Sequence, residues 1–368
     1  MSASQRILIR GVNWLGDAVM STPALERLRQ ALPQSEIALL TPARLAEVWR
    51  HYPHVNRVIE FSAEERPWTI GRRLRNEGFD TALVFPNSPR SALEMWCAGI
   101  PNRLGYARPW RNWFLTRALP VRPEHVRMRK RPAREAKRLV AQAPAASREQ
   151  PPSSAHHVYD YLHLAAALGA SETPVAPRLY VAAGEIEETA QRFSLRVGRP
   201  LFGLNAGAQY GPAKRWPMHR FIAAAIEAQR KSNCRWIIFG GPHESEMARQ
   251  IAEGIREALP QTEDEPLNVA GRSSLRDLCV LLKMCRVVLT NDSGPMHVAA
   301  AVGTPVVVPF GSTSPELTGP GLPGERNGLL IGTAPCAPCF LRECPVDFRC
   351  MTSITVEQVV RALLLAAG

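Results

Sequence analysis

The sequence predicts an α/β fold with two doubly wound domains, each a parallel sheet with helices on both faces. Short β-branched runs alternate with amphipathic helical stretches along most of the chain, which is the pattern of βαβ units. The alternation begins again after a stretch rich in Ala, Pro and Ser at residues 143–154. The length of 368 residues also suits about two domains, and a hydrophobic content of 45% excludes a chain disordered throughout.

The first half contains predicted strands separated by predicted helices. The strands are expected at residues 7–10, 37–40, 57–61 and 82–85. The helices are expected at residues 18–31, 45–51, 69–76 and 91–97. A further helical stretch covers residues 157–168, and a segment with Pro174 and Pro177 follows it. We therefore place the first domain at residues 1–175.

The second half repeats this pattern and forms the second predicted domain, residues 176–368. Its strands are expected at residues 201–205, 236–239, 267–269, 287–289 and 306–309. Its helices are expected at residues 218–231, 244–257, 274–284 and 296–301, with a final helix at 356–366. Ligands of such sheets bind outside the carboxyl ends of the strands. We expect the functional loops to follow strands and to face a cleft between the domains.

The N-terminus and the hydrophobic runs predict a cytoplasmic protein. The apolar run at residues 7–9 is closed by Arg10 and is too short for the core of a signal peptide. No stretch reaches the roughly 18 apolar residues of a transmembrane helix. Four of the eight cysteines lie in apolar patterns and are expected to be small core residues: Cys97, Cys234, Cys279 and Cys285.

The loop after the first strand is a glycine-flanked turn that ends in an acid at the start of a helix. Gly11 and Gly16 have the spacing of a P-loop, but Asp17 and Ala18 stand where Lys and Ser or Thr would be needed. A carboxylate there would repel a phosphate, which excludes a nucleotide-hydrolysing P-loop. The Gly-x-Gly-x-x-Gly of dinucleotide-binding enzymes is also absent. Asp17 can cap the next helix, act as a general base, or do both.

Two loops of the second half suggest a phosphate site. Lys214 and Arg215 follow the strand at 201–205, either as a solvated basic loop or as phosphate ligands. The strand at 287–289 leads through Asn291-Asp-Ser-Gly294 into an Ala-rich helix, whose free N–H groups suit a diphosphate. His297 in the first turn is either a donor or a packed side chain. The loop at residues 240–244 is a weaker candidate for contact with a base or ribose.

These residues together resemble the ADP-heptose:lipopolysaccharide heptosyltransferases of glycosyltransferase family 9. The matching pieces lie in both halves: residues 10–17 (Arg-Gly-Val-Asn-Trp-Leu-Gly-Asp), 213–217 (Ala-Lys-Arg-Trp-Pro), 291–297 (Asn-Asp-Ser-Gly-Pro-Met-His) and the cysteines near 336. The first and last of these favour the type II members over type I. The resemblance implies a GT-B fold, with two Rossmann-like domains facing across a cleft, and an inverting, metal-independent transfer.

The resemblance also implies roles for individual residues. Asp17 would deprotonate the acceptor hydroxyl, and Lys214 would neutralise the departing diphosphate. The donor, ADP-L-glycero-β-D-manno-heptose, would be held by Asp292, Ser293, Gly294, Met296 and His297. The acceptor would be the first inner-core heptose on Kdo-lipid A, in lipopolysaccharide core assembly. No cofactor is required for this transfer.

Four cysteines crowd into residues 336–350 and form a candidate structural metal site. They are Cys336, Cys339, Cys344 and Cys350. A Cys-x-x-Cys half followed by two more thiols can surround a tetrahedral metal, although the second pair is spaced more widely than usual. The alternative is a set of reduced, packed thiols, since a cytosolic location disfavours disulfides.

The formal net charge of +12 is concentrated in one segment. Residues 108–138 hold eleven cations and two acids, a net charge of +9, with Trp110, Trp113 and Phe114 among them. Such a segment can be a solvated face, but its charge exceeds what solubility requires. We expect it to bind the anionic acceptor at the inner-leaflet membrane surface. The acceptor-side candidates are Asn13, Arg127, Arg129, Lys130 and Arg131.

Two other functions remain open from the residues alone. One is a glycosyltransferase of the same fold with another nucleotide sugar or inner-core acceptor, such as a type I enzyme. The other is a nucleic-acid-binding protein, which only the net charge supports, since zinc-finger spacing and RNP-like aromatic strands are absent. The expected protein is thus cytoplasmic, peripheral to the inner membrane, and free of nucleic acid.

Overall fold

A computed structural model describes residues 5–142, 151–195, 198–259 and 265–368, and the chain within it forms two compact units. The first unit comprises Met1–His125 and Ser154–Tyr180, and the second comprises Val126–Ser153 and Val181–Gly368. Most of the expected linker at 143–154 lies outside the described residues. This division differs from a single boundary at residue 175, because residues 126–142 pack on the second unit. The backbone N–H of Arg131, for example, donates to the carbonyl of Cys339 at 2.9 Å.

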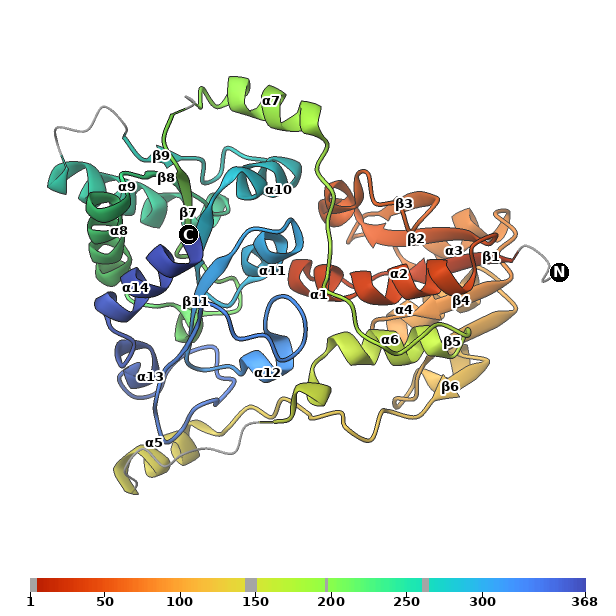
Figure 1. The fold of residues 1–368 in the computed structure, drawn as a ribbon. Coiled ribbons are helices and arrows are strands. Elements are labelled where there is room, and N and C mark those ends of the chain that lie inside the picture. The colour runs from red at the N-terminus through yellow and green to blue at the C-terminus, as the bar shows by residue number, and fades with distance from the viewer. Residues whose placement is uncertain (1–4, 143–150, 196–197, 260–264) are drawn as a thin grey trace. The chain divides into compact units, whose positions relative to one another are not determined.

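The first unit is built on a six-stranded parallel sheet with the order β3-β2-β1-β4-β5-β6 (Figure 1). Its strands are β1 (Arg6–Arg10), β2 (Glu36–Pro42), β3 (Arg57–Phe61), β4 (Thr81–Val84), β5 (Asn102–Tyr106) and β6 (Arg117–Leu119). Its helices are α1 (Leu15–Met20), α2 (Thr22–Ala31), α3 (Pro67–Arg75), α4 (Pro89–Cys97) and α6 (Val158–Ala166), with short 3₁₀ turns η1 (Ala43–Trp49), η2 (Asn112–Phe114) and η3 (Ser153–Ala155).

The second unit has a six-stranded parallel sheet in the order β12-β11-β10-β7-β8-β9. Its strands are β7 (Leu201–Asn205), β8 (Arg235–Ile238), β9 (Leu267–Asn268), β10 (Val287–Thr290), β11 (Val306–Phe310) and β12 (Leu329–Ile331). Its helices are α5 (Ala133–Gln142), α7 (Ala183–Arg192), α8 (Met218–Ser232), α9 (Ser245–Ala258), α10 (Leu275–Met284), α11 (Gly294–Ala301), α12 (Pro315–Thr318), α13 (Arg349–Thr352) and α14 (Val356–Ala367), with 3₁₀ turns η4 (Pro212–Lys214) and η5 (Pro242–Glu244).

Both sheets follow the same Rossmann order. Counted from the first strand of each unit, the order is 3-2-1-4-5-6 in both, so β7 corresponds to β1 and β10 to β4. The order reverses between β1 and β4, and again between β7 and β10. Ligands of doubly wound sheets bind at the carboxyl ends of the strands at such a switch point. The loops after these four strands are therefore the places to search for function.

The central strands are apolar because helices cover both faces of each sheet. Ile7, Leu8 and Ile9 of β1 are fully buried, as are Val287, Val288 and Leu289 of β10. Continuous rather than alternating apolar runs are typical of such parallel strands. This explains why the sequence reveals these strands clearly.

One predicted helix, at residues 18–31, is two helices in the structure. The break between α1 and α2 lies at Ser21, two residues before Pro23, which cannot donate a backbone hydrogen bond. The hydroxyls of Ser21 and Thr22 donate instead to the carbonyls of Ala18 and Val19, at 2.7 and 2.8 Å. These side chains satisfy carbonyls that a continuous helix would have bonded through its backbone.

Candidate functional site

Asp17 lies at the carboxyl edge of the first sheet, in the first turn of α1. The cap position of this helix is held by Trp14, so Asp17 is the third residue of the first turn, where the helix dipole favours a negative charge. The hydroxyl of Tyr161, on α6, donates to Asp17 Oδ1 at 3.1 Å. Burial and the neighbouring Asp17 raise the pKa of Tyr161 well above its usual value, so Tyr161 stays protonated as a donor. Asp17 is partly exposed.

Two histidines and an arginine extend the polar surroundings of Asp17 in the first unit. Asp160 Oδ1 accepts from Arg122 Nε at 3.1 Å, and its Oδ2 lies 3.0 Å from His125 Nδ1. Desolvation lowers the pKa of His157, while Asp160 and Asp17 act in the opposite direction. His157 and His125 stack with ring centroids 6.4 Å apart. A cluster of two histidines, an arginine and a second acid therefore lies near Asp17.

Asn13 is fixed on the same loop by two arginines. Its side-chain oxygen accepts from Arg10 Nη1 at 3.2 Å, and its carbonyl accepts from Arg44 Nη2 at 2.5 Å. The structure thus brings Asn13 and Asp17 onto one short segment after β1.

Lys214 and Asp292 meet at the switch point of the second sheet. Lys214 ends η4, after β7, and its Nζ lies 2.7 Å from Asp292 Oδ2. The hydroxyl of Thr313, after β11, donates to the same oxygen at 2.6 Å. The lysine side chain is 14% exposed and the aspartate 5%. Asp292 therefore holds a cation in place, and that cation keeps a small exposed part.

Two asparagines lock the neighbouring loops together. Asn205, at the end of β7, donates to Thr290 Oγ1 at 3.1 Å and to Ser293 Oγ at 3.2 Å. Asn291 donates to the carbonyl of Ala206 at 2.7 Å and accepts from the backbone N–H of Trp216 at 2.9 Å. The strand ends thus present Ser293 and the first turn of α11 in a fixed geometry.

The remaining expected donor residues differ in exposure. Ser293 and Gly294 are partly exposed at the start of α11. Met296 is fully buried and His297 nearly so, because α11 is apolar on all sides and packs inside the unit. The side chain of Met296 therefore belongs to the packing of α11.

Glu244, in the weak sequence candidate at residues 240–244, lies at the same edge. Its Oε2 accepts from the backbone N–H of Gly241 at 3.0 Å. A Cβ placed on Gly207 would overlap the Glu244 carboxylate, so a larger residue at position 207 would displace this acid from its present place. The loops after β7, β8 and β10 thus surround one edge with a cation, an acid and a helix N-terminus.

The comparisons with known proteins agree with this arrangement. The family model described as "Glycosyltransferase family 9 (heptosyltransferase)" matches residues 130–348. The chain belongs to glycosyltransferase family 9. It is 31% identical to lipopolysaccharide heptosyltransferase 2 of Escherichia coli K12, over 86% of this chain and 85% of that protein. It is 32% identical to lipooligosaccharide heptosyltransferase 2 of Haemophilus ducreyi, over 86% of each.

A solved structure agrees with the fold of this family 9 glycosyltransferase. The structure of E. coli ADP-heptose LPS heptosyltransferase II aligns with a TM-score of 0.77 and 28% identity, over 99% of this chain and 98% of that one. The predicted α/β fold of the GT-B type is thereby confirmed, as is the prediction of a glycosyltransferase.

The basic segment of this glycosyltransferase is divided between the two units. Arg108, Arg111, Arg117 and Arg122 lie in the first unit, and the cations from Arg127 onward lie in the second. The segment at residues 108–138, which lies wholly in the first domain by the predicted boundary at residue 175, is thus shared between the two units. Arg127, Arg129 and Arg131 line a cavity of about 490 Å³, closed on other sides by apolar and acidic residues: Val126, Glu135, Pro151, Pro152, Leu317, Pro338 and Phe340. Lys130 does not line it.

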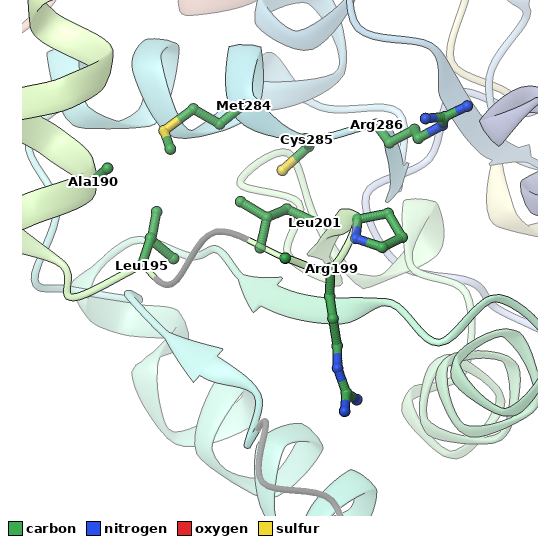
Figure 2. A pocket seen from close by; sticks show the side chains of 9 residues that line it. Ala190, Leu195, Arg199, Leu201, Met284, Cys285 and Arg286 are labelled. Atoms are coloured by element: carbon green, nitrogen blue, oxygen red, sulfur yellow. The ribbon is translucent and has the colours of Figure 1, made fainter.

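A second cavity, of about 590 Å³, lies away from the loops that carry Lys214 and Asp292. Figure 2 shows the residues that line it. The cavity is lined by Ala190, Leu195, Gly198, Arg199, Pro200, Leu201, Met284, Cys285 and Arg286. Leu201 begins β7, and Cys285 and Arg286 directly precede β10. The cavity is therefore at the amino edge of the sheet, opposite the loops that carry Lys214 and Asp292.

The clustered cysteines are free thiols. Cys336, Cys339 and Cys350 are buried, and Cys344 accepts from the backbone N–H of Phe348 at 3.3 Å. Burial, followed by the neighbouring thiols, raises the pKa of Cys350 to about 12. Within the described part of the chain, no group of three or more His, Cys, Asp or Glu side chains is arranged to hold a metal ion.

The described residues also include no helix that is both long and apolar enough to cross a membrane. Sequence reasoning did not single out Tyr161 or Thr313. Tyr161 reaches Asp17 across 144 positions and Thr313 reaches Asp292 across 21, and no local pattern marks such contacts.

Proposed function

We propose that this enzyme transfers L-glycero-D-manno-heptose from ADP-heptose to the first inner-core heptose of Kdo-lipid A, with inversion. The observation that carries the proposal is the Lys214–Asp292 pair at the switch point, beside the start of α11 and the Glu244 carboxylate. A nucleotide-diphosphate sugar matches these three groups. The sugar and acceptor are taken from the curated relatives, which are named for heptose transfer to lipopolysaccharide and lipooligosaccharide.

On the donor side, each group has a distinct task. Lys214 neutralises the charge that develops on the diphosphate as the anomeric C–O bond breaks. Asp292 and Thr313 keep Lys214 oriented, so little reorganisation is needed during the reaction. The first turn of α11, with Ser293 and Gly294, binds phosphate oxygens through its backbone. Glu244 accepts hydrogen bonds from the ribose hydroxyls, a common role of an acid at this edge.

On the acceptor side, Asp17 is the general base. The acceptor hydroxyl oxygen forms the new bond to the anomeric carbon, its proton passes to Asp17, and ADP leaves with the electrons of the broken bond. Tyr161 holds the carboxylate in position through its hydrogen bond. Inversion in one step needs one base and a stabilised leaving group, and no covalent nucleophile.

The acceptor's anionic groups are proposed to bind Asn13 and the arginine-lined cavity. Arg127, Arg129 and Arg131 surround that cavity, and guanidinium groups suit phosphates and carboxylates. Trp110 and Trp113 are 73% and 76% exposed, and exposed tryptophans suit a lipid headgroup region. These features support a chain that works at the anionic inner-leaflet surface, which co-sedimentation with anionic and neutral vesicles tests.

The test is ADP release from ADP-heptose with a core-truncated lipopolysaccharide that ends in one heptose. We expect turnover by the wild type, and Asp17→Asn should lower it about 10²–10⁴-fold while ADP binding is kept. Glu60→Gln, an exposed acid on β3, is the matched control and should keep wild-type turnover. Wild-type turnover by Asp17→Asn would exclude the base assignment.

The same assay distinguishes the proposed function from the alternative glycosyltransferase functions. A type I enzyme, or one with another inner-core acceptor, would release ADP only with an acceptor that lacks the first heptose. A transferase for another nucleotide sugar would show no ADP release from ADP-heptose with either acceptor.

A structural metal at the cysteine cluster is a separate, finer proposal. It is supported by the Cys-x-x-Cys spacing and by the closeness of the thiols, since neighbouring thiols add to the effect of burial in raising the pKa values of Cys336, Cys339 and Cys350. Binding would require the thiols to turn from their present positions toward one another. Metal content of the purified chain, compared with a Cys339→Ser variant, tests this proposal, and a chain without stoichiometric metal would refute it.

A further inference from the structure

Three cations from three separate segments surround the ring of Tyr210. Lys214 Nζ lies 5.0 Å from the ring centroid, Arg342 Cζ 5.4 Å and Lys130 Nζ 5.8 Å. Lys130 belongs to the basic segment before α5, and Arg342 belongs to the cysteine-rich segment at residues 336–350. All of these residues lie in the second unit.

Main-chain contacts hold the three segments together around this ring. The Tyr210 hydroxyl donates to the carbonyl of Phe340 at 2.8 Å. The backbone N–H of Ala213 donates to the carbonyl of Arg342, and that of Arg131 to the carbonyl of Cys339, both at 2.9 Å. These hydrogen bonds therefore hold the backbone segments that carry Lys130 and Arg342 next to Tyr210.

The charges around Tyr210 are only partly compensated. Lys214 has the carboxylate of Asp292 at 2.7 Å. Among the described residues, Lys130 and Arg342 have no carboxylate within ion-pair distance. An aromatic ring attracts each cation, but it does not remove the repulsion between them. The cluster thus retains two positive charges next to a lysine that we assign to the leaving group, and a dianion would satisfy it.

The basic segment at residues 125–132 forms neither a helix nor a strand, and its cations are directed to different neighbours. Arg127, Arg129 and Arg131 face the cavity described above, whereas Lys130 faces Tyr210. Residues 127–131 therefore supply cations both to this cavity and to the ring of Tyr210. Lys130, expected from the sequence on the acceptor side, is turned toward the Lys214 side.

We propose that Lys130 and Arg342 join Lys214 as ligands of the donor's diphosphate, and that Tyr210 is the positioning residue that gathers them. This inference rests on the proposed function, since it assumes a nucleoside-diphosphate donor at Lys214. It also gives the cysteine-rich segment a role, because that segment supplies both Arg342 and the carbonyl that fixes Tyr210.

The test compares the binding of ADP and AMP, which differ by one phosphate, by calorimetry. Lys130→Gln combined with Arg342→Gln should weaken ADP binding at least about tenfold and AMP binding much less, since charge-assisted phosphate contacts are lost. Lys137→Gln combined with Arg138→Gln removes two exposed cations from α5 and should leave both affinities unchanged.

Variants of Tyr210 test whether its ring positions the three cations or only supports the local fold. Tyr210→Leu removes the ring and should lower the ADP-to-AMP affinity ratio, whereas Tyr210→Phe keeps the ring and should largely preserve it. If the wild type binds ADP more tightly than AMP and the Lys130→Gln/Arg342→Gln variant has the same ADP-to-AMP affinity ratio, this inference is wrong while the proposed donor site still stands. A wild type that does not prefer ADP to AMP would overturn the proposed donor site, and the inference with it.

Discussion

Each of the two units has a cation–carboxylate pair that joins the chain at or after its first strand to the chain after its fourth strand. In the first unit, Arg10 at the end of β1 pairs with Glu94 on α4, which follows β4, at 2.6 Å. In the second, Lys214 after β7 pairs with Asp292 after β10, at 2.7 Å. Because β7 corresponds to β1 and β10 to β4, both pairs bridge the switch point of their sheet.

The two pairs differ in their access to solvent. Arg10 and Glu94 are 3% and 0% exposed, whereas Lys214 and Asp292 are 14% and 5% exposed. Arg10 also donates to the carbonyl of Gly11 and lies over the Phe61 ring, 4.3 Å from its centroid. Glu94 accepts from both Arg10 and Arg90. The first pair is thus closed by protein groups and supports the fold, while the second keeps its cation available to a ligand.

Glu94→Gln should give the largest effect on stability. It leaves the buried Arg10 charge without its carboxylate, which costs about 3–5 kcal/mol in comparable sites. Urea denaturation should show an earlier unfolding transition for the first unit. Glu77→Gln, which removes a half-exposed partner of Arg57, is the control and should cost about 1 kcal/mol or less. Equal losses in the two variants would contradict a structural role for the Arg10–Glu94 pair.

Lys214→Ala should lower turnover strongly and stability only a little, the reverse of Glu94→Gln. Turnover should fall about 10²–10³-fold, since the charge on the leaving diphosphate is no longer offset. The free energy of unfolding should fall less than in Glu94→Gln, because Asp292 keeps its hydrogen bond from Thr313. Steady-state ADP release and urea denaturation of the same preparation check both parts. Full turnover without Lys214 would exclude its role at the leaving group.

The sequence predicted the central strands of both sheets because they are apolar on both faces. It missed β5, β6 and β12, since these strands are short or polar and two of them are edge strands. Asn102 and Arg103 in β5 break the apolar pattern that marks its neighbours. Such strands form because the sheet offers them a partner, which no local pattern records.

The candidate site was partly predictable for a related reason. Asp17, Lys214 and Asp292 follow strands within short motifs, so their position at the sheet edge could be read from the chain. Tyr161 and Thr313, and Tyr210 in its contacts with Phe340 and Arg342, act through contacts that only the packed fold creates. The packing of residues 126–142 on the second unit could not be predicted either, since it depends on contacts such as Arg131 to Cys339.

Asp292→Asn gives the smallest effect and the sharpest comparison, because it repeats the acid-to-amide change of Glu94→Gln at the equivalent place. The amide still accepts from Thr313 but no longer attracts Lys214, so the cation is less well positioned while it remains in contact with water. We expect turnover to fall about tenfold, equal to about 1.4 kcal/mol of barrier, with a smaller change in unfolding free energy. The same substitution would then cost stability in one unit and rate in the other. If Asp292→Asn instead destabilised the second unit as much as Glu94→Gln destabilises the first, with turnover unchanged, both pairs would be structural, and the difference in solvent access would carry no functional meaning.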